Sequence, residues 1–248
     1  MRIAVVTPYY REDNEILGRC MNSVRAQSMH VDHILIADGH PQEWVEDYDN
    51  VDHLVLRKSS ADYGDTPRSL GFLLAIRRDY DIIQFLDADN VLFSNHFEAV
   101  LNGFAATGAE LLIARRHMLR PDGSIINWTS EEDENLQHVD TSCYVFSRNA
   151  FPVGLKWSYI PRELGCVDDR VFFASVKCSN LKISALPIKT VGYTCMWPGV
   201  YRAIGEDPPP GHREIMDRYA DAKTWWNTLD ENRRQLIQRN LGATINIV

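Results

Sequence analysis

In the first third of the chain, short apolar runs alternate with segments in which apolar residues recur every three or four positions. The apolar runs predict strands at Ile3 to Thr7, His33 to Ala37, His53 to Leu56 and Ile82 to Leu86. The periodic segments predict two amphipathic helices, one with Ile16, Leu17, Cys20, Met21 and Val24 and one with Leu70, Leu73, Leu74 and Arg77. Strands that alternate with helices indicate an α/β fold with a central, mostly parallel sheet flanked by helices.

Each of these predicted strands runs into a polar loop. The loops are Thr7-Pro8-Tyr9-Tyr10, Asp38-Gly39-His40, Ser59 to Asp65, and Asp87-Ala88-Asp89-Asn90. In open α/β sheets, the ligand crevice lies beyond the carboxyl ends of the strands. We therefore expect the four loops to share one site.

The pattern changes in the rest of the chain. A helix is predicted from Ser94, as N-cap, to Thr107, with Gly108 ending it, and another from Val167 to Cys178. Strands are predicted at Leu111 to Ala114, Tyr144 to Phe146 and Lys182 to Leu186. Pro121-Asp122-Gly123 predicts a hairpin turn, Ser130 to Gln137 an acidic loop, and Pro208-Pro209-Pro210-Gly211 a break before a terminal helix from about Arg213.

Composition narrows the class of protein. The chain has 248 residues, 45% of them hydrophobic and 24% charged, as expected for one soluble globular domain. Its 26 Lys and Arg against 34 Asp and Glu give a net charge of -8, which argues against nucleic-acid binding. Such a protein can still bind an anionic nucleotide if a metal ion or a few cations neutralise the phosphates locally.

The remaining bulk features favour a cytoplasmic protein. Its five cysteines are an odd number without a C-x-x-C pair, which suits a reducing compartment. The N-terminus begins with a strand pattern rather than a signal peptide. Apolar stretches such as Phe72 to Ile76 are far shorter than the roughly 20 residues of a membrane span, so we expect membrane contact to be peripheral at most.

The strongest candidate for chemistry is the acidic pair after the fourth predicted strand. Asp87 and Asp89 are separated by Ala88, so both can offer hard oxygen atoms at the edge of the sheet. Mg²⁺ or Mn²⁺ suits such a site and leaves coordination positions for phosphate oxygens. We expect Asp89 to be the main ligand and Asp87 to support it. The same triplet also occurs in solvated loops and helix caps.

Several stretches around these loops resemble the motifs of the family 2 glycosyltransferases, which have the GT-A fold. Ile3 to Tyr10 is similar to the family's opening strand, Arg19 to Ser28 to its first helix, and Asp38-Gly39 to its acidic turn. Tyr63 to Gly71 resembles its G-x-x-x-A-R-N-x-G stretch. The resemblance extends from Arg2 to about Val176 and rests on the shared order and spacing of these motifs.

The resemblance implies a metal-dependent, inverting glycosyltransferase of polysaccharide biosynthesis. Residues 1–93 would bind a nucleoside diphosphate sugar, with UDP as the expected nucleotide, and residues 94–206 would form the acceptor and catalytic half. Residues 207–248 would add a helical extension to this one domain. The acceptor would be a glycan, a lipid-linked or a small-molecule hydroxyl compound.

The resemblance also assigns residues to the donor pocket. Thr7, Pro8, Tyr9 and Glu12 would line it, and Asp87, Ala88 and Asp89 would hold the diphosphate and its metal ion. Asp38 would contact base or ribose, and Arg68 base or phosphate. The simpler alternatives are an ordinary turn at Asp38-Gly39 and a solvated helix residue at Arg68.

A second acidic pair, Asp168 and Asp169, is the candidate for proton transfer. Gly165 to Phe173 resembles the family's G-E-D segment, in which the second acid is the catalytic base; here that residue is Asp169, and Asp168 replaces the usual Glu. A carboxylate in this position can take the proton of the attacking hydroxyl. The alternative is a capping pair at a helix N-terminus, which is compatible with the base.

Other assignments stay open. The segment Asp140-Thr141-Ser142 would face acceptor or donor sugar, and His212 is a candidate third metal ligand. Trp197, Tyr201, Trp225 and Trp226 could stack on an acceptor sugar. The rival functions are a haloacid dehalogenase-type phosphatase, which also has D-x-D after a strand, and a non-catalytic sugar-nucleotide-binding protein.

Overall fold

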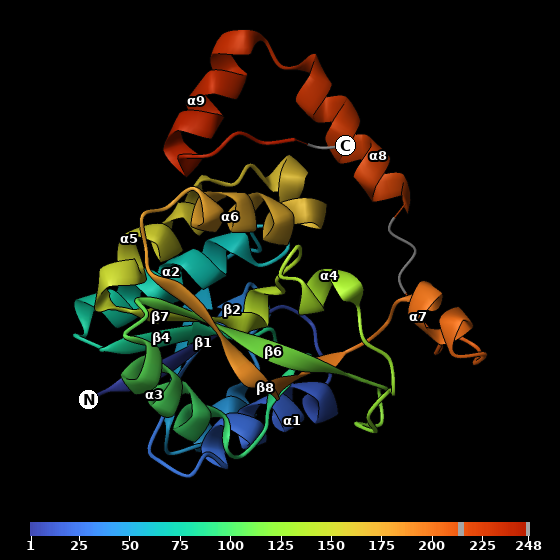
Figure 1. Ribbon diagram of the computed structural model, residues 1–248. Coiled ribbons are helices and arrows are strands. Elements are labelled where there is room, and N and C mark those ends of the chain that lie inside the picture. Colours follow the sequence, from blue (N-terminus) through green and yellow to red (C-terminus); the bar gives the residue numbers. More distant parts are fainter. Residues whose placement is uncertain (213–215, 247–248) are drawn as a thin grey trace.

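An eight-stranded sheet forms the centre of the computed structural model, which describes residues 1–212 and 216–246 (Figure 1). The strands are β1 (Ile3–Tyr9), β2 (Asp32–Asp38), β3 (Val51–Leu56), β4 (Ile82–Phe85), β5 (Val91–Leu92), β6 (Leu111–Leu119), β7 (Tyr144–Ser147) and β8 (Ile183–Thr194). The α-helices are α1 (Asn14–Arg25), α2 (Asp65–Arg77), α3 (His96–Thr107), α4 (Glu131–Glu134), α5 (Phe151–Gly154), α6 (Asp168–Lys177), α7 (Pro198–Ala203), α8 (Met216–Thr228) and α9 (Glu231–Leu241). Short 3₁₀ helices are η1 (Glu43–Asp47), η2 (Thr141–Cys143), η3 (Arg148–Ala150), η4 (Leu155–Tyr159) and η5 (Arg162–Val167).

The strand order is β3-β2-β1-β4-β7-β6-β8-β5. β1 pairs in parallel with β2 and β4, and β2 pairs in parallel with β3. β7 is antiparallel to both β4 and β6, whereas β6 and β8 are parallel. The predicted α/β fold is confirmed, and the N-terminal half of the sheet is its all-parallel part.

Helices cover both faces of this sheet. α1 and α3 lie on one face, and α2, α5 and α6 lie on the other (Figure 1). Between the sheet and the second layer, Phe72 packs against Phe85 and Phe146 with ring centroids 5.1 Å apart in both pairs. Such aromatic contacts bury large apolar areas and hold α2 against β7 and against β4, the strand that leads into the acidic loop.

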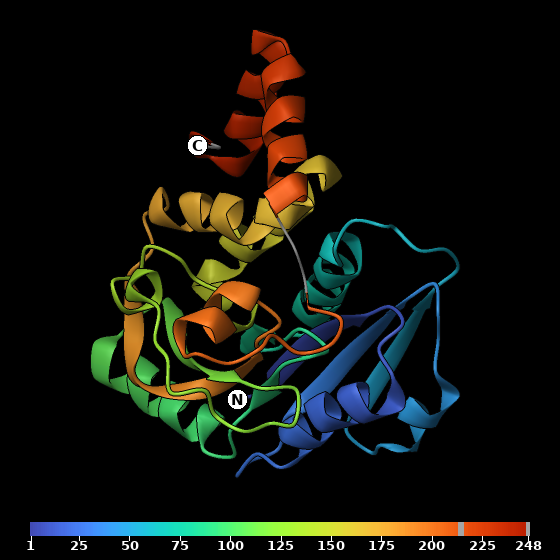
Figure 2. The ribbon, with the colours of Figure 1, turned by 90° about the vertical axis from the view of Figure 1, so that its right-hand side faces the viewer.

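The two C-terminal helices stand above the second layer as a hairpin (Figures 1 and 2). α8 contacts η5, and α9 contacts η4. Trp226, Leu241 and Ile245 are buried in these contacts. The predicted start of the terminal helix at Arg213 lies outside the described residues. Within the described ranges, no helix is long and apolar enough to cross a membrane.

Three local predictions differ from the structure. The predicted apolar face of α2 is wrong, because Leu70 and Leu73 are 39% and 45% exposed while Phe72 packs against the sheet. α3 begins at His96 with Asn95 as its N-cap, and the Asn95 side chain makes no capping hydrogen bond. The acidic stretch predicted as a loop contains the one-turn helix α4. By contrast, the turn at Gly123 is confirmed, with φ 87° and its N–H donated to the Arg120 carbonyl.

Candidate active site

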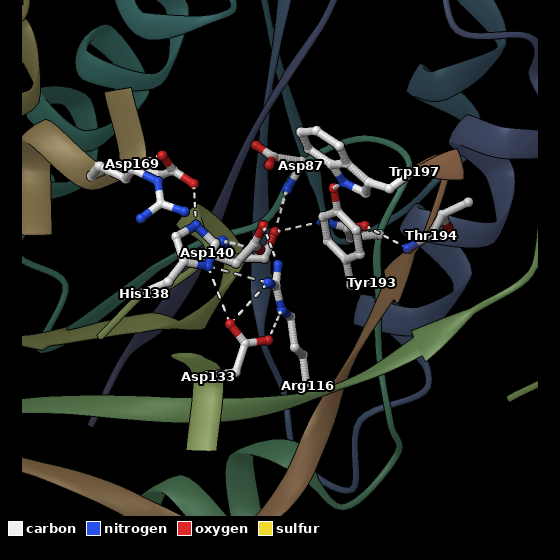
Figure 3. Close-up of polar contacts among 12 residues, drawn as sticks. Asp87, Arg116, Asp133, His138, Asp140, Asp169, Tyr193, Thr194 and Trp197 are labelled. Atoms are coloured by element: carbon white, nitrogen blue, oxygen red, sulfur yellow. Dashed lines mark hydrogen bonds and ion pairs between the residues drawn. The ribbon is translucent and has the colours of Figure 1, made fainter. Parts of the chain in front are cut away.

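The acidic loop after β4 is tied down by residues from distant parts of the chain. Ser142 Oγ accepts from the backbone N–H of Asp87 at 3.1 Å and from the Asn90 side chain at 2.9 Å. Thr194, at the end of β8, donates its hydroxyl to the Asp89 carbonyl and its N–H to the Asn90 side chain (Figure 3). The backbone around Asp87 and Asp89 is therefore fixed, and its two carboxylates can be presented in a defined geometry.

Arg68 joins this loop to the second layer. Its Nη2 donates to Asp87 Oδ1 at 2.8 Å and its Nη1 to Asp65 Oδ1 at 3.0 Å. The Trp157 indole donates to the same Asp65 oxygen at 2.5 Å, and its ring lies 4.8 Å from the guanidinium. The Arg68 side chain is only 4% exposed, so the alternative of a solvated helix residue is wrong. Its expected contact with base or phosphate stays a prediction.

Asp65 and Asp168 face this same cation from α2 and α6. Burial raises the pKa of Asp65 to about 6 even though Arg68 opposes the shift. Removal from solvent, reinforced by Asp65 and Asp169, also raises the pKa of Asp168 well above its ordinary value. Two carboxyl groups that interact in this way hold a proton more tightly than either would alone. Asp168 therefore interacts electrostatically with Arg68, and it keeps its proton to a higher pH than an isolated carboxyl group does.

Asp169 lies one residue further along α6 and is oriented differently. Its Oδ1 accepts from the Arg170 N–H at 2.6 Å, and its Oδ2 accepts from His138 Nε2 at 2.5 Å. Its own N–H is donated to Asp168 Oδ1 at 2.6 Å. Both acids therefore lie in the first turn of α6, where negative charge is favourable, while the N-cap residue is Val167. The Asp169 side chain is still 25% exposed to solvent.

Arg116, in β6, organises the other side of the site (Figure 3). It donates from Nε and Nη2 to the two oxygens of Asp133 at 2.8 and 3.1 Å, and its Nη1 lies 2.9 Å from Asp140 Oδ2. The guanidinium also lies 4.5 Å from the centre of the Tyr193 ring. His138 completes the group, because its Nδ1 lies 3.1 Å from Asp133 Oδ1.

Sequence reasoning missed Arg116, Asp133 and His138 as members of the site. Two of them lie in or directly after the stretch Ser130 to Gln137, which we singled out only for its acidity. A single histidine following a run of acids was the available signal. Arg116 offered none, because a lone arginine in a strand gives no indication of its partners.

The predicted lining of the nucleotide pocket is engaged with protein partners. Thr7 Oγ1 lies 2.8 Å from His33 Nε2 inside the sheet. The Tyr9 hydroxyl accepts from the Gln42 N–H at 2.9 Å and lies 2.8 Å from His53 Nε2. These contacts fix the end of β1, and the expected contacts with a nucleotide stay predictions.

Asp38 has a comparable structural role. It accepts from Ser59 Oγ at 2.9 Å and from the N–H and hydroxyl of Ser60 at 2.8 and 2.9 Å. Gly39 follows with φ 81°, so the segment is a turn whose carboxylate also fastens the neighbouring loop. Pro8 and Ala88 are buried, and Glu12 accepts from the Tyr10 N–H at 2.6 Å.

Asp87 and Asp89 offer two carboxylates to a divalent cation, whose other ligands would have to be phosphate oxygens or waters. Among the described residues, no group of three or more His, Cys, Asp or Glu side chains is arranged to hold a metal ion. Two carboxylates one residue apart nevertheless supply the hard oxygen ligands of Mg²⁺, which commonly binds through one or two carboxylates plus phosphates and waters. His212 is exposed, and its Nδ1 donates to the Pro209 carbonyl at 3.2 Å. Its role as a ligand stays a prediction.

Trp197 is the aromatic candidate that lies at the acidic loop. Its indole donates to the Tyr193 hydroxyl at 2.6 Å, and the neighbouring Thr194 holds the loop at Asp89 (Figure 3). It is 37% exposed, whereas Tyr201 and Trp226 are buried. A sugar ring could therefore stack on Trp197, whereas Tyr201 and Trp226 belong to the buried core.

Comparisons with known proteins identify the family and the fold. Residues 4–160 match the family model "Glycosyl transferase family 2". Among solved structures, the chain is similar to S. aureus TarS 1–349 in complex with UDP-GlcNAc, with a TM-score of 0.65 and 15% identity over 97% of this chain and 72% of that one. The complex of the same TarS fragment with UDP gives a TM-score of 0.63 and 15% identity over 97% and 71% of the two chains. No curated protein matches the chain by sequence.

Proposed function

The chain belongs to glycosyl transferase family 2 and is a glycosyltransferase, and we propose that it uses a nucleoside diphosphate sugar with UDP as its nucleotide. The observation that carries this proposal is the pairing of buried Arg68 with Asp87 and Asp65, with Asp168 close enough to act electrostatically on the same cation. It joins the loop suited to a diphosphate to the helix that begins with Asp168 and Asp169. The similar TarS fragment, whose solved complexes hold UDP and UDP-GlcNAc, supports the choice of nucleotide.

In the proposed reaction, Asp169 takes the proton of the acceptor hydroxyl as the oxygen attacks the anomeric carbon. A single displacement of this kind inverts that carbon. Mg²⁺ or Mn²⁺ held by Asp89 and Asp87 would neutralise the charge of the departing diphosphate. Arg68 keeps Asp87 in place for this ion, and Trp197 offers its exposed face to an acceptor sugar.

We further propose a cytoplasmic enzyme of polysaccharide biosynthesis with a glycan, lipid-linked or small-molecule hydroxyl acceptor. The five cysteines, all within the described ranges, are unpaired, which supports a reducing compartment. The phosphatase alternative loses its basis, because the family match covers the D-x-D loop itself. The non-catalytic alternative is not favoured either, since Asp87, Asp89 and Asp169 are all present.

Replacing Asp169 with Asn tests the assignment of the base. We expect transfer to fall by at least about a hundredfold, because an amide cannot take the proton and general bases contribute roughly 10² to 10⁴ in rate. Affinity for UDP with Mn²⁺ should barely change, since the group acts mainly in the transition state. Turnover can be followed as UDP release from a panel of UDP-sugars, and affinity by calorimetry.

Asp122→Asn, in the hairpin turn after β6, is the matched control and should keep wild-type turnover. Full activity of the Asp169 variant would remove Asp169 from its role. If none of the UDP-sugars binds or turns over while another nucleotide sugar does, the choice of UDP is wrong and the class of reaction stands.

A further inference from the structure

His138 holds Asp169 with one ring nitrogen and Asp133 with the other. Its Nε2 lies 2.5 Å from Asp169 Oδ2, and its Nδ1 lies 3.1 Å from Asp133 Oδ1. Ionised carboxylates only accept hydrogen bonds, and a neutral imidazole carries one N–H. Both contacts can form together only if the ring is an imidazolium. Its side chain is 14% exposed, so these contacts are largely shielded from water.

The charges around the ring favour the imidazolium. Asp133 faces it from α4, Asp169 from α6 and Asp140 from the residue before η2, while Arg116 faces it from β6. In the imidazolium, Nδ1 donates to Asp133 and does not accept from Arg116 Nη2, which lies 3.3 Å away. Three carboxylates thus oppose one guanidinium. Burial alone would lower the pKa of His138, but its hydrogen bonds to Asp133 and Asp169 raise that pKa to about 9.

This ion pair orients Asp169 and leaves its carboxylate able to accept a further hydrogen bond. His138 holds Oδ2, and the Arg170 N–H holds Oδ1 at 2.6 Å, so the plane of the carboxylate is fixed. Each carboxylate oxygen has two lone pairs, and one remains on each for an acceptor hydroxyl. The same histidine ties α4 to α6, and Arg170 pairs with Glu132 at 3.0 Å across the same junction.

We propose that His138 is a positioning residue for the transfer reaction, which in its protonated form holds Asp169 in the orientation that receives the acceptor's proton. This inference rests on the proposed role of Asp169 as base. The competing explanation is that His138 only fastens the segment containing α4. A fastening role predicts changes in stability, whereas a positioning role predicts changes in kcat and in its pH dependence.

His138→Gln tests the inference, because glutamine is neutral at every pH. We expect kcat to fall by about tenfold to a hundredfold, as for other groups that orient a catalytic side chain, with little change in the KM of the donor. In the wild type, kcat/KM should fall as pH rises through about 9, where the imidazolium loses its proton. The variant should lack this decline. Activity is measured as UDP release between pH 6 and 10.

The matched control is His30→Gln, because His30 lies 2.9 Å from Asp32 but is 77% exposed and outside the site. It should keep both the rate and the pH profile of the wild type. If Asp169→Asn is inactive while His138→Gln keeps the wild-type rate and profile, the inference fails and the proposed function stands. If Asp169→Asn is fully active, the proposed base itself is wrong.

A direct titration keeps the inference testable should His138→Gln fold poorly. The ring of His138 can be followed by NMR in wild-type protein labelled at histidine. It should titrate near 9 in the wild type and at lower pH in Asp169→Asn, where one of its anionic partners is gone. An ordinary titration near 6.5 in both proteins would overturn the inference.

Discussion

At the scale of single residues, Arg68 shows how the site balances its charges. One buried guanidinium forms ion pairs with Asp65 and Asp87 and also interacts electrostatically with Asp168. A buried cation with several anionic partners stabilises little by itself, but its loss leaves carboxylates buried without compensation. The residue therefore matters for stability as well as for the placement of Asp87.

Arg68→Met should cost about 3–5 kcal/mol of the free energy of unfolding at neutral pH. Asp65 has a folded pKa of about 6 against an ordinary 3.8, so the folded state holds this proton more tightly. Stability from this group is present below pH 4 and is lost as pH rises through about 6. Without Arg68, the pKa rises further, and the variant should lose less stability at pH 5 than at pH 8, as urea unfolding at both values would measure.

Arg25→Met is the control, because Arg25 lies 3.7 Å from Asp49 and the two side chains are 58% and 81% exposed. It should change stability little at either pH, since exposed ion pairs contribute little. An equal loss at pH 5 and pH 8 for the Arg68 variant would contradict the role assigned to its carboxylate partners.

At the scale of elements, the centres of strands were predictable and their polar ends were not. β6 was expected to end at Ala114 and β8 at Leu186, but they extend to Leu119 and Thr194. The added residues include Arg116, which pairs with Asp133 and Asp140, and Thr194, which fastens the acidic loop. A run of apolar residues indicates a buried strand. It does not indicate the part of a strand whose polar side chains bind partners distant in the sequence.

The close packing of α2 on the sheet gives a prediction at the same scale. A Cβ on Gly71 would lie 2.6 Å from Val6 Cγ1 and closer still to Ile36 Cδ1. Gly71→Ala should therefore destabilise the fold by about 1–3 kcal/mol through overpacking, although alanine favours helices. Urea unfolding of the two proteins measures the difference.

Gly18→Ala, within α1, separates packing from helix propensity. Its Cβ would meet Trp44 Cη2 at an ordinary 3.8 Å. This variant should be neutral or more stable by up to about 1 kcal/mol, because glycine is the weaker helix former. Equal effects of the two substitutions would contradict the close approach of α2 to β1 and β2.

At the scale of the whole molecule, the acidic loop depends on segments from nearly the full chain. The sequence placed Asp87 and Asp89 at a strand end, and the parallel direction of the first four strands follows from the alternation of strands and helices. The fastening of this loop by Ser142 and Thr194 was not predictable. Neither residue belongs to a local pattern that points to the loop.

Because ligand binding stabilises the entire fold, UDP with Mn²⁺ should raise the melting temperature. At a ligand concentration one hundred times Kd, the gain is about 2.7 kcal/mol. For a chain of this size that corresponds to roughly 5–10 °C. Thermal melts with UDP and Mn²⁺ together, and with each alone, measure the effect.

Asp89→Ala should remove most of the shift in melting temperature that Mn²⁺ with UDP causes in the wild type. His212→Ala provides a comparison for the third candidate ligand. A full shift in the Asp89 variant would argue against the proposed metal site.

The hydrogen bonds between Thr194 and the loop of Asp89 also bear on how the protein is made. The two residues lie 105 positions apart, so the loop stays incomplete until β8 has emerged from the ribosome and paired with β6. The parallel strands β1 to β4 can associate much earlier during synthesis. A nascent chain therefore has the parallel part of its sheet before Thr194 fastens the loop of Asp87 and Asp89, so the candidate site is completed late in translation.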